Sequence, residues 1–374
     1  MSKILFISHD AYHTGAPILL LNLIRLLKQK GYSINTLVKN PEGPLLKEFA
    51  ELSGKSSTIY KKRNHSRLGR LVALFKKQSL NDISTYLSEV EVIFNNTITN
   101  GDILTLIKNN TSAKIVTYVH ELEVASQVFT TPSHIDHTLA FSDLFLVPCV
   151  TVRKFLIAKY NISPQKILIL NYFIPPAILT RNTPKNKEKF VVGGCGTTDW
   201  RKGFDIFLLI AKKVVSQLPD ATIIFKWKGI QVGSESHIKA LYDIHKLGLE
   251  AHIELLESSR DVQTFYETLH LFLLPSREDP YPLVVLEAAA CGVPTVCFDG
   301  AGGAVEFVEK NAGKIVPYLS IDSMATAVIE YYSNRILLAS DGENASHKLI
   351  TLHQDEELIL QQFSNVLLQI HLKD

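Results

Sequence analysis

Two carboxylates stand eight positions apart in the segment PSREDPYPLVVLEAAACGVP. Asp279 lies in the proline-rich part, and Glu287 lies one to two turns into the helix that the apolar residues predict. A helical carboxylate can accept hydrogen bonds from a vicinal diol such as ribose. The free N–H groups of the first turn, near Leu283 and Val284, can bind phosphate oxygens. The segment therefore predicts a nucleotide site, although an acidic first turn that complements the helix dipole would explain Asp279 alone.

A second candidate is the segment GGCGTTDWRKG, residues 193–203, which follows an expected strand and opens a helix. Arg201 and Lys202 can stabilise the charge of a leaving diphosphate, and the glycines let a ligand approach the backbone. Cations are unfavourable at a helix N-terminus, so two of them indicate an anionic partner. A solvated basic helix start is the alternative.

The first loop, SHDAYHTGAP at residues 8–17, offers the N–H groups of Gly15 and Ala16 beside a helix N-terminus. They could contact a phosphate. A simple tight turn into the helix fits this loop equally well, because no complete GxGxxG pattern is present.

The positions of these loops depend on the strands and helices that they connect. Short apolar runs alternate with longer helical patterns in both halves of the chain, which predicts two Rossmann-like α/β domains with parallel sheets. Parallel sheets bind ligands at the carboxyl ends of their strands. The expected strands are residues 4–7, 34–38, 92–94, 115–119, 144–147 and 167–170, then 190–192, 222–225, 252–255, 271–274 and 295–298.

A chain of 374 residues exceeds what one hydrophobic core usually organises. A linker rich in Pro, Asn, Lys and Thr at residues 171–189 separates the two patterns. We expect an N-terminal Rossmann-like domain at 1–175 and a C-terminal Rossmann-like domain at 176–352. A last helix at 353–374 can cross back to the first domain.

The net charge of +2, with 46% hydrophobic and 20% charged residues, predicts a globular protein and argues against one that coats nucleic acid. The start, MSKILFIS, has no long apolar stretch behind it, so we expect no secretory signal and a cytoplasmic location. The densest apolar run, 18–27, is half the length that a bilayer needs and predicts a buried helix.

The spacing of the cysteines predicts reduced, buried thiols rather than a disulfide framework or zinc site. No DxD metal motif is present, so no metal or other cofactor is expected. The four cysteines are Cys149, Cys195, Cys291 and Cys297.

Together, these motifs resemble those of a GT-B fold glycosyltransferase of retaining family 4, over nearly the whole chain. The resemblance implies parallel sheets that face each other across a cleft, with an acceptor-side domain at 1–175 and a nucleotide-sugar-binding domain at 176–352. It rests on the glycine-bearing first loop, the Lys202-Gly203 helix entry, the acid pair Asp279 and Glu287, and the cluster of Gly302, Gly303 and Glu306.

The resemblance also implies roles for single residues. Glu287 would hold the donor ribose, Asp279 would lie by the transferred sugar, and Arg201 and Lys202 would hold the diphosphate. His120, in VTYVHELE, matches the family histidine near the donor sugar and the reacting centre. A surface or core histidine is the alternative.

Three positions depart from the family pattern. Asp279 stands where glutamate is usual, with Glu278 beside it as a substitute. Thr197 takes the place of the usual phosphate-binding arginine, whose role Arg201 would then have to fill. Asn171 is followed by Tyr, Phe and Ile instead of Gly, Val and Asp.

The implied activity is retaining, metal-independent transfer of a hexose or related sugar from a nucleotide diphosphate sugar to a hydroxyl, in cell-surface glycan or glycolipid synthesis. Two alternatives remain. A sugar-nucleotide hydrolase or epimerase would use Asp279 and Glu287 as an acid/base pair. A non-catalytic nucleotide-sugar sensor could share the fold.

A basic segment, KKRNHSRLGRLVALFKK at Lys61–Lys77, could bring the protein to its acceptor. Seven of its seventeen residues are Lys or Arg, and its apolar residues fall at helical spacing. Such a helix can lie on the anionic inner face of a membrane, beside a lipid-linked acceptor. An ordinary solvated helix is the alternative.

Overall fold

The computed structural model describes residues 3–54, 56–58, 87, 89–176, 189–259, 261–309 and 311–371. The chain forms two compact units: unit 1 is Met1–Phe173 with Asp355–Asp374, and unit 2 is Ile174–Gln354. The chain passes between them after residues 173 and 354, against the expected 175 and 352.

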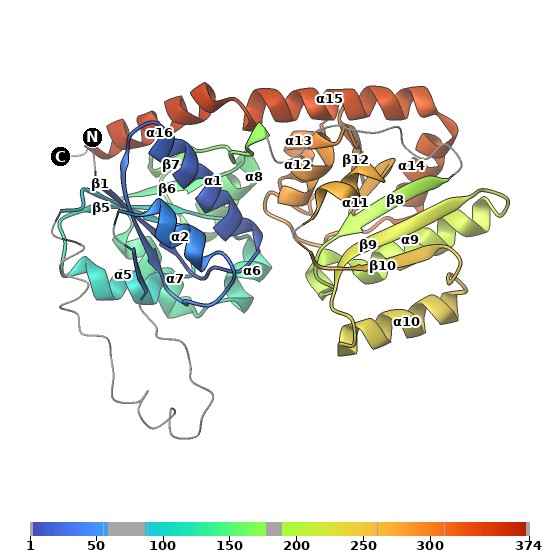
Figure 1. The fold of residues 1–374 in the computed structure, drawn as a ribbon, viewed down its shortest axis with the longest axis horizontal. Helices are drawn as coiled ribbons and strands as arrows, with labels where there is room; N and C mark the ends of the chain where they lie inside the picture. Colours follow the sequence, from blue (N-terminus) through green and yellow to red (C-terminus); the bar gives the residue numbers. More distant parts are fainter. Residues whose placement is uncertain are drawn as a thin grey trace, which may run out of the picture. The chain divides into compact units, whose positions relative to one another are not determined.

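Unit 1 is built on a parallel sheet of seven strands in the order β3-β2-β1-β4-β5-β6-β7 (Figure 1). The side chains of β1, β4 and β6 are buried almost throughout, because helices cover both faces of the sheet. The strands are β1 Lys3–Ser8, β2 Ser33–Val38, β3 Ser56–Thr58, β4 Val92–Asn95, β5 Lys114–Tyr118, β6 Leu144–Val147 and β7 Ile167–Ile169.

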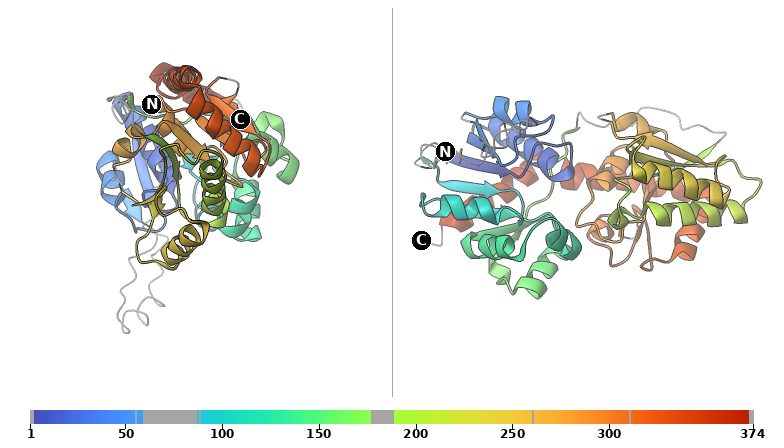
Figure 2. Two further views of the ribbon diagram at one scale, coloured as in Figure 1. Left: turned by 90° about the vertical axis from the view of Figure 1, so that its right-hand side faces the viewer. Right: turned by 90° about the horizontal axis from the view of Figure 1, so that it is seen from below.

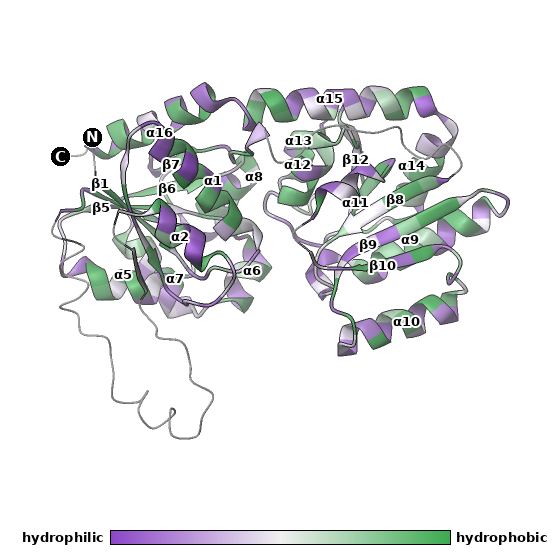
Figure 3. Cartoon of the chain, viewed as in Figure 1, coloured by the Kyte–Doolittle hydropathy of each residue, from purple (hydrophilic) through white to green (hydrophobic). Residues whose placement is uncertain are grey.

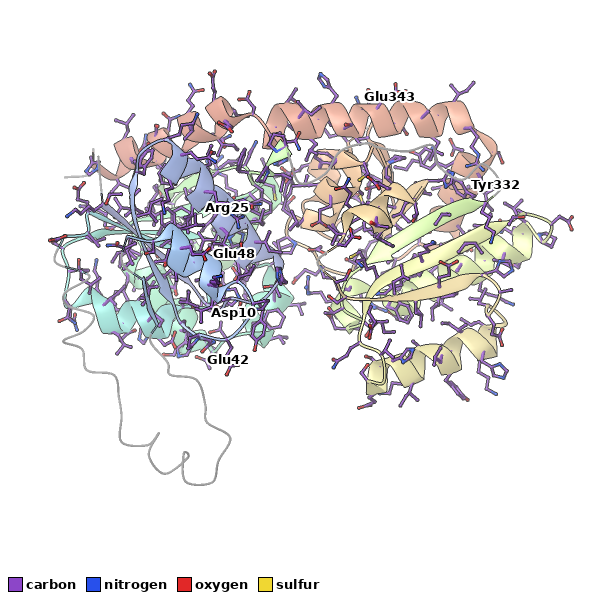
Figure 4. The ribbon with its side chains drawn as sticks, viewed as in Figure 1. Asp10, Arg25, Glu42, Glu48, Tyr332 and Glu343 are labelled. Atoms are coloured by element: carbon purple, nitrogen blue, oxygen red, sulfur yellow. The ribbon has the colours of Figure 1, made fainter. Side chains whose placement is uncertain are left out.

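The expected buried helix of the apolar run 18–27 is confirmed as α1, Gly15–Gln29. Arg25 of α1 and Glu48 of α2 form an ion pair, and Figure 4 shows both side chains between the two helices. No helix in the described part of the chain is long and apolar enough to cross a membrane. The other helices of unit 1 are α2 Leu46–Leu52, α5 Gly101–Lys108, α6 Glu123–Val128, α7 Pro132–Phe141, α8 Val150–Tyr160 and α16 Glu356–His371.

Helix α16 completes unit 1 although it follows all of unit 2 in the sequence. Its Phe363 ring lies 5.8 Å from the ring of Tyr32 and 6.3 Å from that of Phe94. Phe94 belongs to β4, so the C-terminal helix packs against the central strands of the first sheet.

Unit 2 contains a parallel sheet of six strands in the order β10-β9-β8-β11-β12-β13, and the views of Figure 2 show its helices around it. Apolar residues run through its strands (Figure 3). The strands are β8 Phe190–Cys195, β9 Ile223–Ile230, β10 Ile253–Glu257, β11 Leu271–Leu274, β12 Thr295–Phe298 and β13 Gly313–Val316; the helices are α9 Phe204–Gln217, α10 Glu235–Leu247, α11 Gln263–Glu267, α12 Leu283–Ala290, α13 Ala304–Val308, α14 Ile321–Ser333 and α15 Arg335–His353.

Two glycines of the second candidate segment lie inside strand β8 and not in its loop. A Cβ at Gly193 would stand 2.2 Å from the side chain of Leu269, and one at Gly194 would stand 2.6 Å from Trp227. These glycines make room for core side chains, so the expectation that they admit a ligand is wrong.

All four cysteines are free, and only Cys195 is not fully buried.

Candidate active site

Asp279, Arg201 and Lys202 meet at the carboxyl ends of β8 and β11 in unit 2. The Lys202 Nζ lies 2.7 Å from Oδ2 of Asp279, and Arg201 Nη1 lies 3.8 Å from its Oδ1. Asp279 is only 6% exposed. A buried carboxylate requires such partners, because an unpaired charge loses its hydration without compensation. The anionic partner expected for the two cations is thus supplied, at least in part, by the protein itself.

Backbone geometry fixes this cluster. Arg201 and Lys202 lie in a short 3-10 turn, Trp200–Lys202, which Asp199 caps by accepting from the Arg201 N–H at 2.9 Å. Gly203 follows with φ of +72°, and a Cβ there would stand 2.0 Å from the carbonyl oxygen of Pro275. The two cations therefore precede helix α9 instead of occupying its first turn.

The loop after β11 is held from two sides. Arg201 Nη1 donates to the carbonyl oxygen of Glu278 at 2.9 Å, while the Asp279 N–H donates to Ala301 at 2.7 Å. Gly302 pairs with Asp279, and a Cβ at Gly302 would stand 1.7 Å from the Asp279 carbonyl oxygen. Of the two neighbouring acids, Asp279 is the one whose carboxylate Lys202 contacts.

Glu287 lies on α12, with its side chain partly buried. Its Oε2 accepts a hydrogen bond from the hydroxyl of Tyr266 at 2.8 Å. Burial raises the pKa of the Glu287 carboxyl, and the bond from Tyr266 lowers it. Oε1 makes no hydrogen bond with a described residue, so a diol would meet one free oxygen and one that is shared.

Leu283 and Val284 form the first turn of α12, after Pro282 at the N-cap. No side chain caps this turn, so within the described chain the N–H groups of Leu283 and Val284 remain available to an acceptor. They belong to the same loop and helix as Asp279 and Glu287.

Cys195, at the end of β8, lies among these charged groups. Burial raises the pKa of its thiol to about 12, and the charge of Glu287 adds to the rise, while Lys202 and Lys228 oppose it. The thiol therefore lies close enough to Glu287, the residue expected to bind ribose, and to Lys202, the residue expected to bind phosphate, to be affected by both charges.

In unit 1, His120 follows β5 and its ring is held by two side chains. Asn96 Nδ2 donates to the carbonyl oxygen of Ala16 at 2.9 Å, so its Oδ1 faces His120 and can only accept. The contact between His120 Nε2 and this oxygen, at 2.9 Å, therefore places the proton on Nε2. Nδ1 then accepts from the hydroxyl of Tyr172 at 2.9 Å.

Burial and the neighbouring His9 lower the pKa of His120 to about 3. Next to it, Glu121 is buried and accepts from Thr97, from the N–H of Ile98 and from the N–H of His120. This carboxylate fixes the turn after β5, where the histidine stands.

Gly15 and Ala16 begin helix α1, and a Cβ at Gly15 would meet open space. Gly15 is thus not required by crowding within unit 1. Ala16 enters the site indirectly, because its carbonyl oxygen orients Asn96 and so determines the tautomer of His120.

Sequence reasoning missed three supporting residues: Tyr266, Asn96 and Tyr172. The sequence pointed to Tyr172, because it is the first of the residues after Asn171 that differ from the family pattern. Nothing in the sequence pointed to Tyr266 or Asn96, because only the folded chain brings them to Glu287 and His120.

The basic segment Lys61–Lys77 lies outside the described residues. No group of three metal-ligating side chains occurs in the described ranges.

Residues 178–348 match the family model of glycosyl transferases group 1. The chain is 26% identical over 201 residues to an uncharacterized glycosyltransferase of Haemophilus influenzae, covering 53% of this chain and 55% of that protein. It is 31% identical over 182 residues to the alpha-galactosylglucosyldiacylglycerol synthase of Streptococcus pneumoniae, covering 46% and 44%. The chain thus spans about half the length of these relatives.

Among solved structures, Anabaena HepE in complex with UDP and glucose has a TM-score of 0.79 at 18% identity, covering 98% of this chain and 99% of that one. This likeness shows the fold. The expected GT-B fold and the resemblance to glycosyltransferases are confirmed, while the assignment to retaining family 4 stays a prediction.

Proposed function

Because residues 178–348 match glycosyl transferases group 1, we propose that this protein transfers a sugar from a nucleotide diphosphate sugar to a hydroxyl acceptor, with retention at the anomeric carbon. The observation that carries the proposal is the row of groups along one edge of the unit 2 sheet. Lys202 and Asp279 stand at its phosphate end, and Glu287 stands beside them with one carboxylate oxygen free.

The two cations bind the diphosphate in this proposal. A lysine ammonium has three donors and a guanidinium has five, so Lys202 and Arg201 can keep Asp279 and still donate to phosphate oxygens. The uncapped N–H groups of Leu283 and Val284 add donors. Fixed donors of this kind stabilise the charge that develops on the leaving diphosphate, and we assign this stabilisation to them without a metal ion.

The reaction then needs no protein nucleophile. The bond from the anomeric carbon to the phosphate oxygen breaks, and the acceptor oxygen forms its bond to the same face. The acceptor proton passes to an oxygen of the departing diphosphate. Asp279 stands by the transferred sugar in this proposal. Both ring nitrogens of neutral His120 are already bonded, to Asn96 and Tyr172, so its role near the reacting centre rests on the resemblance alone.

Relatives support a hexose donor and a cell-surface product. The HepE complex contains UDP and glucose, and other relatives include a lipopolysaccharide core mannosyltransferase of Rhizobium leguminosarum. We therefore place this protein in glycan or glycolipid synthesis at the cytoplasmic face of the membrane. Lys61–Lys77 would then bind that face and bring a lipid-linked acceptor within reach.

Glu287→Gln tests the site. Replacing the carboxylate by an amide of the same shape weakens the hydrogen bonds from the ribose diol, so we expect affinity for the preferred nucleoside diphosphate to fall about 10- to 100-fold. Titration calorimetry with UDP, GDP and ADP measures it, and thermal unfolding checks the fold. Glu343→Gln, at an exposed position of α15 in the same unit (Figure 4), is the matched control and should bind as wild type.

Equal nucleotide affinity in wild type and Glu287→Gln would contradict the assignment. Activity is followed with UDP-glucose and a hydroxyl acceptor. Fast sugar release without any acceptor would instead show a hydrolase, and tight binding without turnover on any acceptor would show a sensor.

A further inference from the structure

Lys228 is a buried cation that the proposed reaction leaves unused. It ends the regular part of β9 and is only 7% exposed. Its Nζ donates to Oγ of Ser259 at 2.7 Å and lies 3.4 Å from the carbonyl oxygen of Glu257. No carboxylate of the described residues pairs with it. Burying an ammonium with only neutral partners is costly, and an ammonium has a third donor to offer.

The head of Lys228 is held in place and not loosely packed. The Ser259 hydroxyl accepts a hydrogen bond from Nζ and donates one to the carbonyl oxygen of Asp261 at 3.1 Å. Ser259 is an exposed residue, so its hydroxyl holds the ammonium group near the surface of unit 2, while the rest of the Lys228 side chain is buried. This arrangement presents one N–H donor at a fixed position.

Strand order places that donor relative to the proposed donor site. Lys228 pairs in register with Cys195 on the neighbouring strand β8, and the Cys195 thiol senses the charges of Glu287, Lys202 and Lys228. Along the carboxyl edge of the sheet, the loop after β11 carries Asp279, and β8, β9 and β10 follow in that order.

The charge of Glu287 acts on the Cys195 thiol at the end of β8, so the ribose site lies near the end of that strand. With the diphosphate at Lys202 and the ribose at Glu287, a base that continues along the edge away from Asp279 reaches the end of β9, where Lys228 pairs with Cys195.

We propose that Lys228 is the base-selecting residue of this site, held by Ser259, and that it favours uracil or guanine over adenine. An ammonium donates to the ring carbonyl oxygens of uracil and guanine, as lysine does to guanine O6 and N7. The amino group of adenine would set a second donor against it. This inference rests on the proposed function, because it takes the ribose to be at Glu287.

Lys228→Met tests it, because methionine keeps the apolar stem and removes the donor. We expect affinity for UDP or GDP, whichever the wild type prefers, to fall about tenfold, while affinities for ADP and for inorganic pyrophosphate stay unchanged. Lys226→Met is the matched control: Lys226 lies two residues earlier on the same strand, paired with Glu254 at 3.0 Å. It should bind all three as wild type.

Ser259→Ala is a second variant, since it leaves the buried lysine in place and should reduce the same preference by a smaller factor. It replaces Lys228→Met should that variant fail to fold. An unchanged preference for UDP or GDP over ADP overturns the inference. An equal loss for pyrophosphate also overturns it, because Lys228 would then serve phosphate. A wild type that binds no nucleotide removes the proposed function as well, so the two failures are distinguishable.

Discussion

The imidazole of His120 is neutral and fixed in one tautomer. Asn96 accepts from Nε2, and the hydroxyl of Tyr172 donates to Nδ1. With a pKa of about 3, this ring does not exchange a proton with substrate near neutral pH. It can orient groups beside it. A proton transfer by this ring is not needed in a mechanism in which the leaving diphosphate takes the proton of the acceptor hydroxyl.

Tyr266 sets the ionisation of Glu287. Its hydroxyl stabilises the charged carboxylate, so Tyr266→Phe should raise the pKa of Glu287 above its already raised value. Ribose binding uses the ionised form and is lost as pH falls through that pKa. The loss of UDP affinity should therefore begin at higher pH in Tyr266→Phe than in wild type.

Calorimetric titrations between pH 5 and pH 8 measure this shift. Tyr242→Phe, at an exposed position of α10, is the control and should follow the wild-type profile. Superimposable profiles for wild type and Tyr266→Phe would show that the hydroxyl has no influence on the site.

At the scale of elements, the turn between β8 and α9 decides where the two cations stand. Gly203 and Gly233 both have left-handed backbones, with φ of +72° and +78°, but only Gly203 is crowded, by the carbonyl oxygen of Pro275. Gly233→Ala should lower the free energy of unfolding by about 1 kcal/mol, for the left-handed backbone alone.

Gly203→Ala adds a backbone clash and should cost about 3 kcal/mol. It should also reduce nucleotide affinity, because the turn that carries Arg201 and Lys202 must move. Urea unfolding and calorimetry compare the two variants. Equal losses of stability would mean that the contact with Pro275 relaxes freely.

At the scale of the whole molecule, unit 1 depends on the last helix of the chain. Phe363 is buried against Phe94 and Tyr32, so Phe363→Ala should destabilise unit 1 by about 3 to 5 kcal/mol. Leu368→Ala on the same helix is the control, because Leu368 is 60% exposed and should matter little.

The two tryptophans, Trp200 and Trp227, both lie in unit 2. Circular dichroism reports on both units, while tryptophan fluorescence reports on unit 2. In Phe363→Ala the dichroism should show a transition at lower urea, with the fluorescence midpoint unchanged. A joint shift of both signals would show instead that the units unfold as one.

Most of the parallel strands, and the segments that carry Asp279, Glu287, Arg201 and Lys202, could be predicted from the sequence. Continuous apolar runs and helical periodicity are local signals, and they identify buried strands and helix starts without knowledge of their neighbours. Strands β3 and β13 escaped because they are short and partly polar, and their place comes from pairing with β2 and β12.

Which side chains meet depends on the packing of the folded chain. Lys202 and Asp279 are 77 positions apart, and Tyr266 and Glu287 are 21 apart, so no local pattern announces either pair. The same holds for Lys228 with Ser259, and for Phe363 with Phe94. Such partners are selected when buried charges and rings must find complementary groups during packing, and that requirement acts through space and not along the chain.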